Sequence, residues 1–126
     1  MKSIYIKDTE KYGRGVYARY DIKIGQVIEI SPVILLRKKE ADYIKDTIVS
    51  EYWFGWKAGD FDSAIALGYG SLFNHSYTPN AAFYNNKDNL VIIFYALSNI
   101  KADQEITVNY NGDPTDKSPL WFSVID

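Results

Sequence analysis

The residues with the clearest chemical potential lie in one short segment, FNHSYTPN, at residues 73–80. It holds the only histidine of the chain, His75, directly after Asn74. The Asn74 amide carries both donors and an acceptor, so it could recognise the ammonium or carboxylate end of an amino acid. Pro79 fixes the backbone after the turn and biases the preceding residue toward extended geometry. For the His75 side chain, a buried and hydrogen-bonded core position is favoured over a ligand contact.

Two further segments could contribute to the same site, one near each end of the chain. KYGRGVYA at 11–18 contains Arg14 and Gly15 in a Gly-Arg-Gly turn, which allows a backbone to approach a ligand but also occurs in ordinary β-turns. EITVNY at 105–110 alternates like a strand and ends on Tyr110. A phenol at a strand end lies at the rim of a core, where pockets often form, although many strand-end tyrosines are purely structural.

Composition restricts the class of protein. The 126 residues are 47% hydrophobic and 16% aromatic, which excludes a disordered chain and predicts a single domain with a real core. A net charge of −2 argues against nucleic acid as a direct partner. With no cysteine and one histidine, no metal site is expected. The chain lacks an apolar run of membrane-spanning length and a signal peptide, so we expect a soluble intracellular protein, located in the cytoplasm.

Short β-type runs dominate the rest of the chain, which predicts a mostly β fold. The expected strands occupy residues 3–7, 15–20, 26–37, 63–68, 80–86, 89–97 and 105–110. Pro32 is expected to break the third run or to mark a bulge. One helix is expected at 38–52, where apolar residues recur at helical spacing and charges fill the other face.

Each of the three segments is a weak signal alone, but their order and spacing together resemble the SET-domain family of protein lysine methyltransferases. GRGVYA, NHSYTPNA and QEITVNY carry the resemblance, which covers about residues 3–112. We therefore expect one SET domain over residues 1–126, with a tail at 113–126 that packs near the active site. The absence of Cys-rich flanking modules resembles the compact SET proteins of viruses and bacteria. The resemblance implies a β-clip of small curved sheets with a C-terminal pseudoknot, in which a late segment passes under an earlier loop.

The resemblance also implies S-adenosylmethionine as the cofactor and suggests which residues bind it. Arg14 and Gly15 would line its methionine end, mainly through backbone atoms. Asn74 would bind its amino-acid portion, and His75 would contact the adenine through main-chain groups. Tyr110 would be the catalytic tyrosine, with its hydroxyl orienting the amine and the methyl group, and would also contact the cofactor. The family usually has glycine straight after this tyrosine, whereas Asn111 intervenes here.

A set of aromatic residues would form the channel for the substrate lysine. An ungapped count back from the last motif places Tyr95 where the family carries a Phe or Tyr that limits the methylation state, so Tyr95 is a second catalytic candidate. The expected channel residues are Tyr69, Tyr95, Trp121 and Phe122. For Tyr69, Trp121 and Phe122, simple core packing is an equally good interpretation.

The expected substrate is a lysine-containing protein or peptide of basic character, and a homodimer is allowed. Two other functions stay open at this point. A SET-like module could bind peptides without turnover, or a small β-rich interaction domain could use its aromatic residues as a peptide groove. Cofactor binding and methyl transfer would separate the three.

Overall fold

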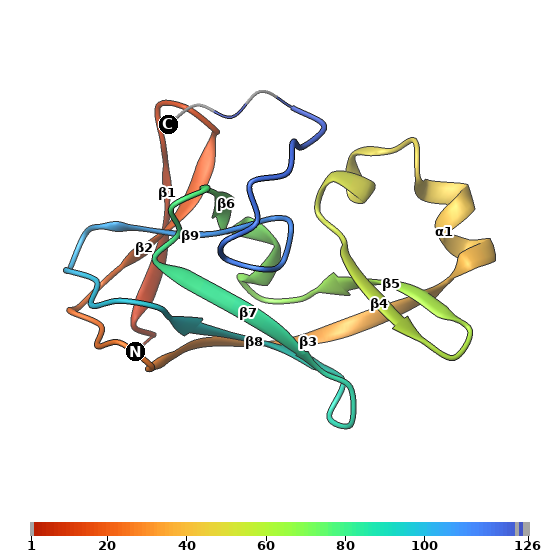
Figure 1. Cartoon of the computed structure of the whole chain (residues 1–126), viewed down its shortest axis with the longest axis horizontal. Helices are drawn as coiled ribbons and strands as arrows, with labels where there is room; N and C mark the ends of the chain where they lie inside the picture. The colour runs from red at the N-terminus through yellow and green to blue at the C-terminus, as the bar shows by residue number, and fades with distance from the viewer. Residues whose placement is uncertain (1, 123, 125–126) are drawn as a thin grey trace.

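The computed structural model describes residues 2–122 and residue 124, which form two β-sheets and a few short helices (Figure 1). A four-stranded sheet has the order β1-β2-β9-β6, and a five-stranded sheet has the order β4-β5-β3-β8-β7. The strands are β1 (Ile4–Asp8), β2 (Arg14–Ala18), β3 (Val27–Arg37), β4 (Phe54–Ala58), β5 (Phe61–Ala66), β6 (Asn74–His75), β7 (Ala81–Asn86), β8 (Val91–Ala96) and β9 (Glu105–Val108). The helices are α1 (Lys38–Ile44) and the 3₁₀ turns η1 (Ile48–Glu51) and η2 (Gly70–Leu72).

An aromatic cluster forms the part of the core nearest the site. Phe73, which follows η2, and Phe94 of β8 stack with ring centroids 4.6 Å apart, and both side chains are buried. Phe54 of β4 packs edge-on against Phe83 of β7 at 5.1 Å. Aromatic pairs in these geometries add to the stability gained from burial. Four separate elements therefore meet at one rigid, apolar surface.

The expected helix at 38–52 is divided in two. α1 ends at Ile44, and a 3₁₀ turn follows at Ile48–Glu51. Between them, the Ser50 hydroxyl donates to the carbonyls of Lys45 and Thr47, and the Thr47 hydroxyl donates to that of Ile44. Such side-chain bonds to the backbone compete with helical hydrogen bonds, so they explain the interruption.

Two strand predictions also differ from the structure. β3 runs unbroken through Pro32, and its irregularities lie near its ends, between Val27 and Glu29 and after Leu36. Pro32 fits because its carbonyl still accepts a hydrogen bond, from the Leu67 N–H. The strand β4 was missed, because the glycine within FGWKA weakens its β signal.

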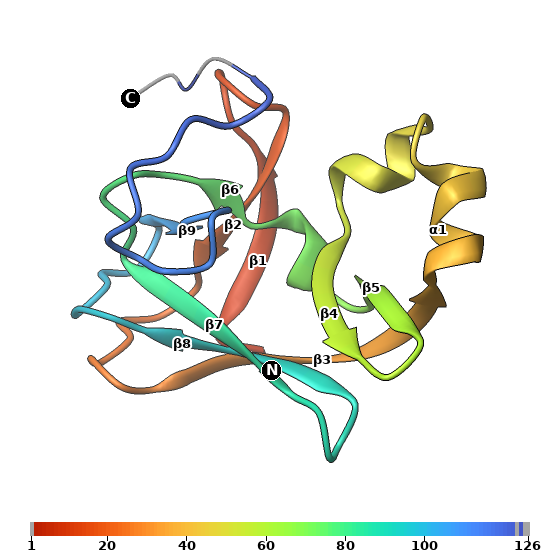
Figure 2. The ribbon, with the colours of Figure 1, turned by 45° about the vertical axis from the view of Figure 1, so that its right-hand side comes forward.

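Two segments distant in sequence, β6 and β9, lie side by side (Figure 2). β6 pairs in parallel with β9, with Asn74 opposite Thr107 and His75 opposite Val108. After β9, the buried Asn109 side chain donates to the Asp116 carbonyl at 2.7 Å, which folds the following residues into a compact loop. This proximity is what the expected pseudoknot requires. Within the described part of the chain, no helix is long and apolar enough to cross a membrane.

Candidate active site

Strands β2, β6 and β9 bring together the Arg14 carbonyl, the Asn74 amide and the Glu105 carboxylate. The Asn74 Nδ2 atom donates to the Glu105 carboxylate at 2.8 Å and to the Arg14 carbonyl at 3.2 Å. Gly15 lies against this pair so closely that an added Cβ would come within 2.6 Å of Glu105 Oε2 and 2.9 Å of Asn74 Nδ2. An added side chain here would displace the ends of Glu105 and Asn74, so the glycine leaves the space in which this amide and carboxylate meet.

The His75 side chain is buried and links β6 to the residue after Asn109. Its Nδ1 atom accepts a hydrogen bond from the Tyr110 N–H at 2.9 Å. In the neutral ring, an accepting Nδ1 leaves the proton on Nε2. The imidazole edge also packs against the ring of Tyr77, with centroids 4.5 Å apart. His75 thus holds the backbone of Tyr110 in a fixed position.

The Tyr110 hydroxyl donates to the Phe73 carbonyl at 2.7 Å. Burial raises the pKa of this phenol well above its usual range, and nearby Tyr52, Glu105 and Tyr12 raise it further. Tyr110 therefore stays protonated at neutral pH, which suits a group that orients a reacting amine rather than one that removes its proton.

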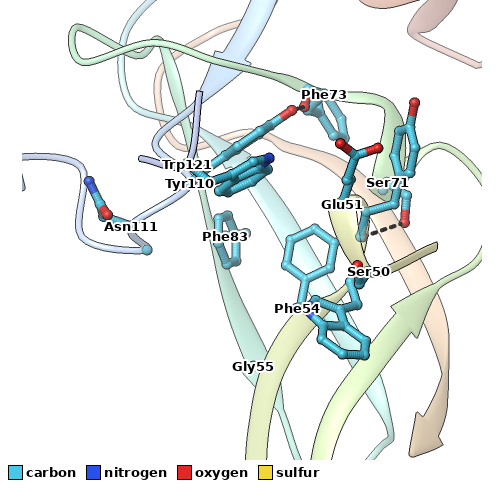
Figure 3. Close-up of a pocket in the computed structure, with 14 residues that line it drawn as sticks. Ser50, Glu51, Phe54, Gly55, Ser71, Phe73, Phe83, Tyr110, Asn111 and Trp121 are labelled. Atoms are coloured by element: carbon cyan, nitrogen blue, oxygen red, sulfur yellow. Dashed lines mark hydrogen bonds between the residues drawn. The ribbon is translucent and has the colours of Figure 1, made fainter. Parts of the chain in front are cut away.

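Trp121 and Phe122 of the C-terminal segment cover the Tyr110 ring. Trp121 stacks on it with centroids 5.9 Å apart and an angle of 12°, and the two rings lie one over the other in Figure 3. Phe122 meets Tyr110 edge-on at 6.1 Å and also contacts the rings of His75 and Tyr12. Residues 123 and 125–126 of the predicted tail lie outside the described residues.

A cavity of about 520 Å³ opens beside Tyr110, and its walls come from several elements (Figure 3). The lining is mainly aromatic, small or neutral polar, which suits the long apolar stem of a lysine. The lining residues are Ser50, Glu51, Tyr52, Trp53, Phe54, Gly55, Gly70, Ser71, Phe73, Phe83, Tyr110, Asn111, Gly112 and Trp121.

Two of the expected channel residues lie elsewhere. Tyr95 alternates in β8 with the buried Phe94, so its side chain is on the opposite face of the sheet, where it contacts the ring of Tyr84 at 6.1 Å. Tyr69 instead lies under the Lys2 ammonium, 4.8 Å from its ring centroid. Neither residue lines the cavity. Strand alternation turns Tyr95 to the other face and Tyr69 packs against Lys2, so both lie away from this cavity. Phe122 contacts Tyr110 without lining the cavity.

Sequence reasoning missed most of the cavity wall. The run EYWFGW at 51–56 supplies five consecutive lining residues, three of them aromatic, and its aromatic density was a usable signal. Phe83 lines the cavity from β7, three residues after Asn80, and only the alternation of that strand could have indicated its direction. Among the residues predicted from sequence, the structure brings together Arg14, Gly15 and Asn74 at one point, with His75 and Tyr110 beside them.

The Asn74 amide, the Arg14–Gly15 backbone and the aromatic cavity are thus connected through His75 and the partly buried Tyr110. The sequence matches the SET domain family over residues 13–111. This chain belongs to the SET-domain family.

Individual relatives agree with that membership. A histone-lysine N-methyltransferase of Schizosaccharomyces pombe, specific for lysine-37 of histone H3, is 39% identical over 118 residues, which span 93% of this chain and 75% of the relative. A crystal structure from Plasmodium falciparum, of a protein assigned as a histone methyltransferase, has a TM-score of 0.71 at 32% identity and covers 87% of this chain and 94% of that one.

A chain of a PRC2 complex, in an autoinhibited conformation bound to S-adenosylmethionine, has a TM-score of 0.72. It is 19% identical and covers 86% of this chain and 15% of that chain, so it supports the fold alone. The predicted family and fold class are confirmed. The predicted enzyme class, an S-adenosylmethionine-dependent protein lysine methyltransferase, is confirmed at the level of the family.

Proposed function

We propose that this chain methylates a lysine in a basic segment of a histone, with Tyr110 at the point of methyl transfer. The observation that carries the proposal is the position of Tyr110. Its backbone is fixed by His75, the neighbour of Asn74, while its ring forms part of the aromatic cavity wall. One residue thus lies between the cavity and the polar crossing, by which we mean the contact of Asn74 with Glu105 and the Arg14–Gly15 backbone.

The polar crossing fits the amino-acid end of S-adenosylmethionine. Both hydrogen bonds that Asn74 makes with other described residues use its Nδ2 atom, so the amide is held in one orientation and its Oδ1 atom is the group left to accept from a ligand. The Gly15 backbone lies directly beside this amide. An ammonium group could therefore be received by Oδ1, with Arg14 and Gly15 contributing backbone groups.

When bound, the cofactor supplies an electrophilic methyl group on a sulfonium centre for in-line displacement by the lysine nitrogen. The residues of this chain position and desolvate the nucleophile. The aromatic wall lowers the pKa of an enclosed lysine, since burial disfavours the charged amine. The protonated Tyr110 hydroxyl, bonded to the Phe73 carbonyl, keeps lone pairs free on its oxygen that help to hold the amine in line.

A basic histone segment is proposed as the substrate on two grounds. The Schizosaccharomyces pombe relative acts on lysine-37 of histone H3. Within this chain, Asp113 and Asp116 follow the cavity residue Gly112, and hydrogen bonds from Thr115 and Ser118 lower the pKa values of these two carboxyls. Both are therefore ionised at neutral pH and favour a positively charged partner.

The test is methyl transfer from labelled S-adenosylmethionine to a histone H3 tail peptide. We expect label on the peptide that contains lysine-37 and none when that lysine is replaced by arginine. Transfer to other proteins of a nuclear extract, with none to histone H3, would reject the histone assignment but not lysine methylation. Cofactor binding by calorimetry without transfer to any peptide or extract would instead support a SET-like binding module without turnover.

The predicted homodimer stays a prediction, and an exposed apolar strip supports it. Ile30, Ile34 and Tyr84 lie on the five-stranded sheet and are 50–56% exposed, and Ile93 pairs with both Ile30 and Tyr84. A two-fold arrangement would cover this strip with its copy. Light scattering at two protein concentrations measures the mass, and a monomer at both would reject the dimer. The cytoplasmic location and the absence of direct nucleic-acid binding also stay predictions.

A further inference from the structure

Glu51 is the only charged side chain among the described residues that line the cavity. It comes from the end of η1 and is exposed, while its neighbours Tyr52, Trp53 and Phe54 supply the aromatic wall. Figure 3 shows its carboxylate among the cavity side chains rather than turned to the outside. Among the described residues, a single negative charge therefore lines the cavity proposed to receive a lysine.

No described residue of the chain neutralises this carboxylate. The ion pairs found in the described residues join Lys2 to Glu29, Arg37 to Glu40, and Lys38 to Asp42. Glu51 takes part in none of them and accepts no hydrogen bond from the described residues. An exposed carboxylate without an internal partner keeps its charge available to a ligand.

The position of Glu51 argues against pairing with the target amine itself. A carboxylate beside the reacting nitrogen would hold it in the charged form, which cannot attack a methyl group. Burial, Tyr52, Glu105 and Tyr12 raise the pKa of Tyr110, and Glu51 is not among these causes. Its side chain is exposed where it lines the cavity, so its charge can reach a substrate residue next to the target lysine.

We propose that Glu51 selects substrates with a lysine or arginine next to the target lysine by pairing with that neighbouring cation. This role rests on the proposed function of lysine methylation. It makes Glu51 a specificity residue that acts on substrate binding, so the preference should appear in KM rather than in kcat. Exposed ion pairs are weak and are screened by salt, so we expect a roughly two- to fivefold preference at low ionic strength.

The experiment compares two peptides that differ only in the residues beside the target lysine, arginine in one and glutamine in the other. Each is assayed with the wild type, Glu51→Gln and the matched control Asp60→Asn. Asp60 is an exposed acid in the β4–β5 turn that does not line the cavity, so its substitution makes the same change in net charge. A second variant, Glu51→Lys, is assayed on a peptide with glutamate at the same flanking positions.

We expect wild type and Asp60→Asn to prefer the arginine peptide through a lower KM, and the preference to fade between about 0.05 and about 0.5 M salt. Glu51→Gln should treat the two peptides alike, and Glu51→Lys should favour the glutamate peptide. An unchanged preference in Glu51→Gln, with normal thermal melting, would overturn the role of Glu51 while leaving lysine methylation intact. No transfer to either peptide by the wild type would overturn the proposed function and this role with it.

Discussion

Replacing Tyr110 with phenylalanine removes a single hydroxyl from the centre of the site. The ring keeps its stacking on Trp121 and its contact with His75, and the main-chain bond to His75 is unaffected. What is lost is the 2.7 Å hydrogen bond to the Phe73 carbonyl. A neutral hydrogen bond contributes about 0.5–1.5 kcal/mol, and an acceptor left unpaired adds a desolvation cost, so we expect the free energy of unfolding to fall by about 1–2 kcal/mol.

The effect on catalysis should exceed the effect on binding. Without the hydroxyl, the amine loses the group that orients it, and we expect kcat to fall at least roughly tenfold, which corresponds to about 1.4 kcal/mol in the barrier. Cofactor affinity should change little, because Asn74 and the strand backbones are untouched. Single-turnover methyl transfer and cofactor calorimetry measure the two quantities separately.

The same variant has a distinctive signature at alkaline pH. The pKa of Tyr110 is raised in the folded protein, so the unfolded chain loses this proton first as the pH rises above about 10. The folded state is therefore destabilised progressively from there upward, and the stability contributed by Tyr110 is fully present below that pH. In Tyr110→Phe this component disappears, so its unfolding free energy should fall less steeply above about pH 10 than that of the wild type.

Tyr5→Phe is the matched control for turnover, because it removes a phenol that donates to Asp103 on the exposed surface and does not line the cavity. The Tyr5→Phe variant should retain wild-type turnover. Urea unfolding at about pH 8 and about pH 10.5 measures the change in unfolding free energy for the wild type and Tyr110→Phe. Wild-type turnover in Tyr110→Phe would refute the catalytic role. An unchanged alkaline slope would refute the claim that this phenol is held protonated.

Three further predictions concern the positions around Tyr110. Asn74→Ala should weaken cofactor binding by at least about tenfold in calorimetry while the protein still melts cooperatively, because the ligand's ammonium loses its acceptor. Gly15→Ala should cost about 1–3 kcal/mol in chemical denaturation, since its Cβ would lie 2.6 Å from a carboxylate oxygen, whereas Gly55→Ala meets nothing within 4 Å and should be nearly neutral in stability. Phe83→Tyr should shift products toward monomethyllysine by placing a hydroxyl in the cavity, and Tyr95→Phe should leave the products unchanged in mass spectra.

From the sequence, the proximity of the segments that carry Asn74 and Tyr110 could be predicted only through the order of the three motifs. Periodicity indicates strands, but it cannot indicate that a two-residue strand at Asn74–His75 pairs in parallel with one that begins 31 residues later, at Glu105. The alternation of Ile106 and Val108 did indicate a strand, but β9 ends at Val108, so Tyr110 lies two residues beyond the strand rather than at its last position. Local patterns therefore identified the elements, and the family resemblance supplied their pairing.

Tyr95 shows why the channel could not be predicted in the same way. An ungapped count gives a position along β8, but the face of the strand depends on which of two adjacent aromatic residues points inward. Phe94 and Tyr95 both suit a pocket by residue type. The core selected Phe94, which packs against Phe73, Phe54 and Phe83, and the alternation of the strand then turned Tyr95 outward.

The contacts that close this fold are the contacts that assemble its site. Asn80 bonds β9 twice, through Nδ2 to the Glu105 carbonyl and through Oδ1 from the Thr107 N–H, each at 2.9 Å. His75 then fixes Tyr110 directly after β9, and these bonds join residues 25–35 positions apart. Because such long-range pairings must bring distant segments together before they contribute stability, they form late compared with the hairpins. We therefore expect Tyr110 to reach the position of its proposed catalytic role only once β6 has paired with β9.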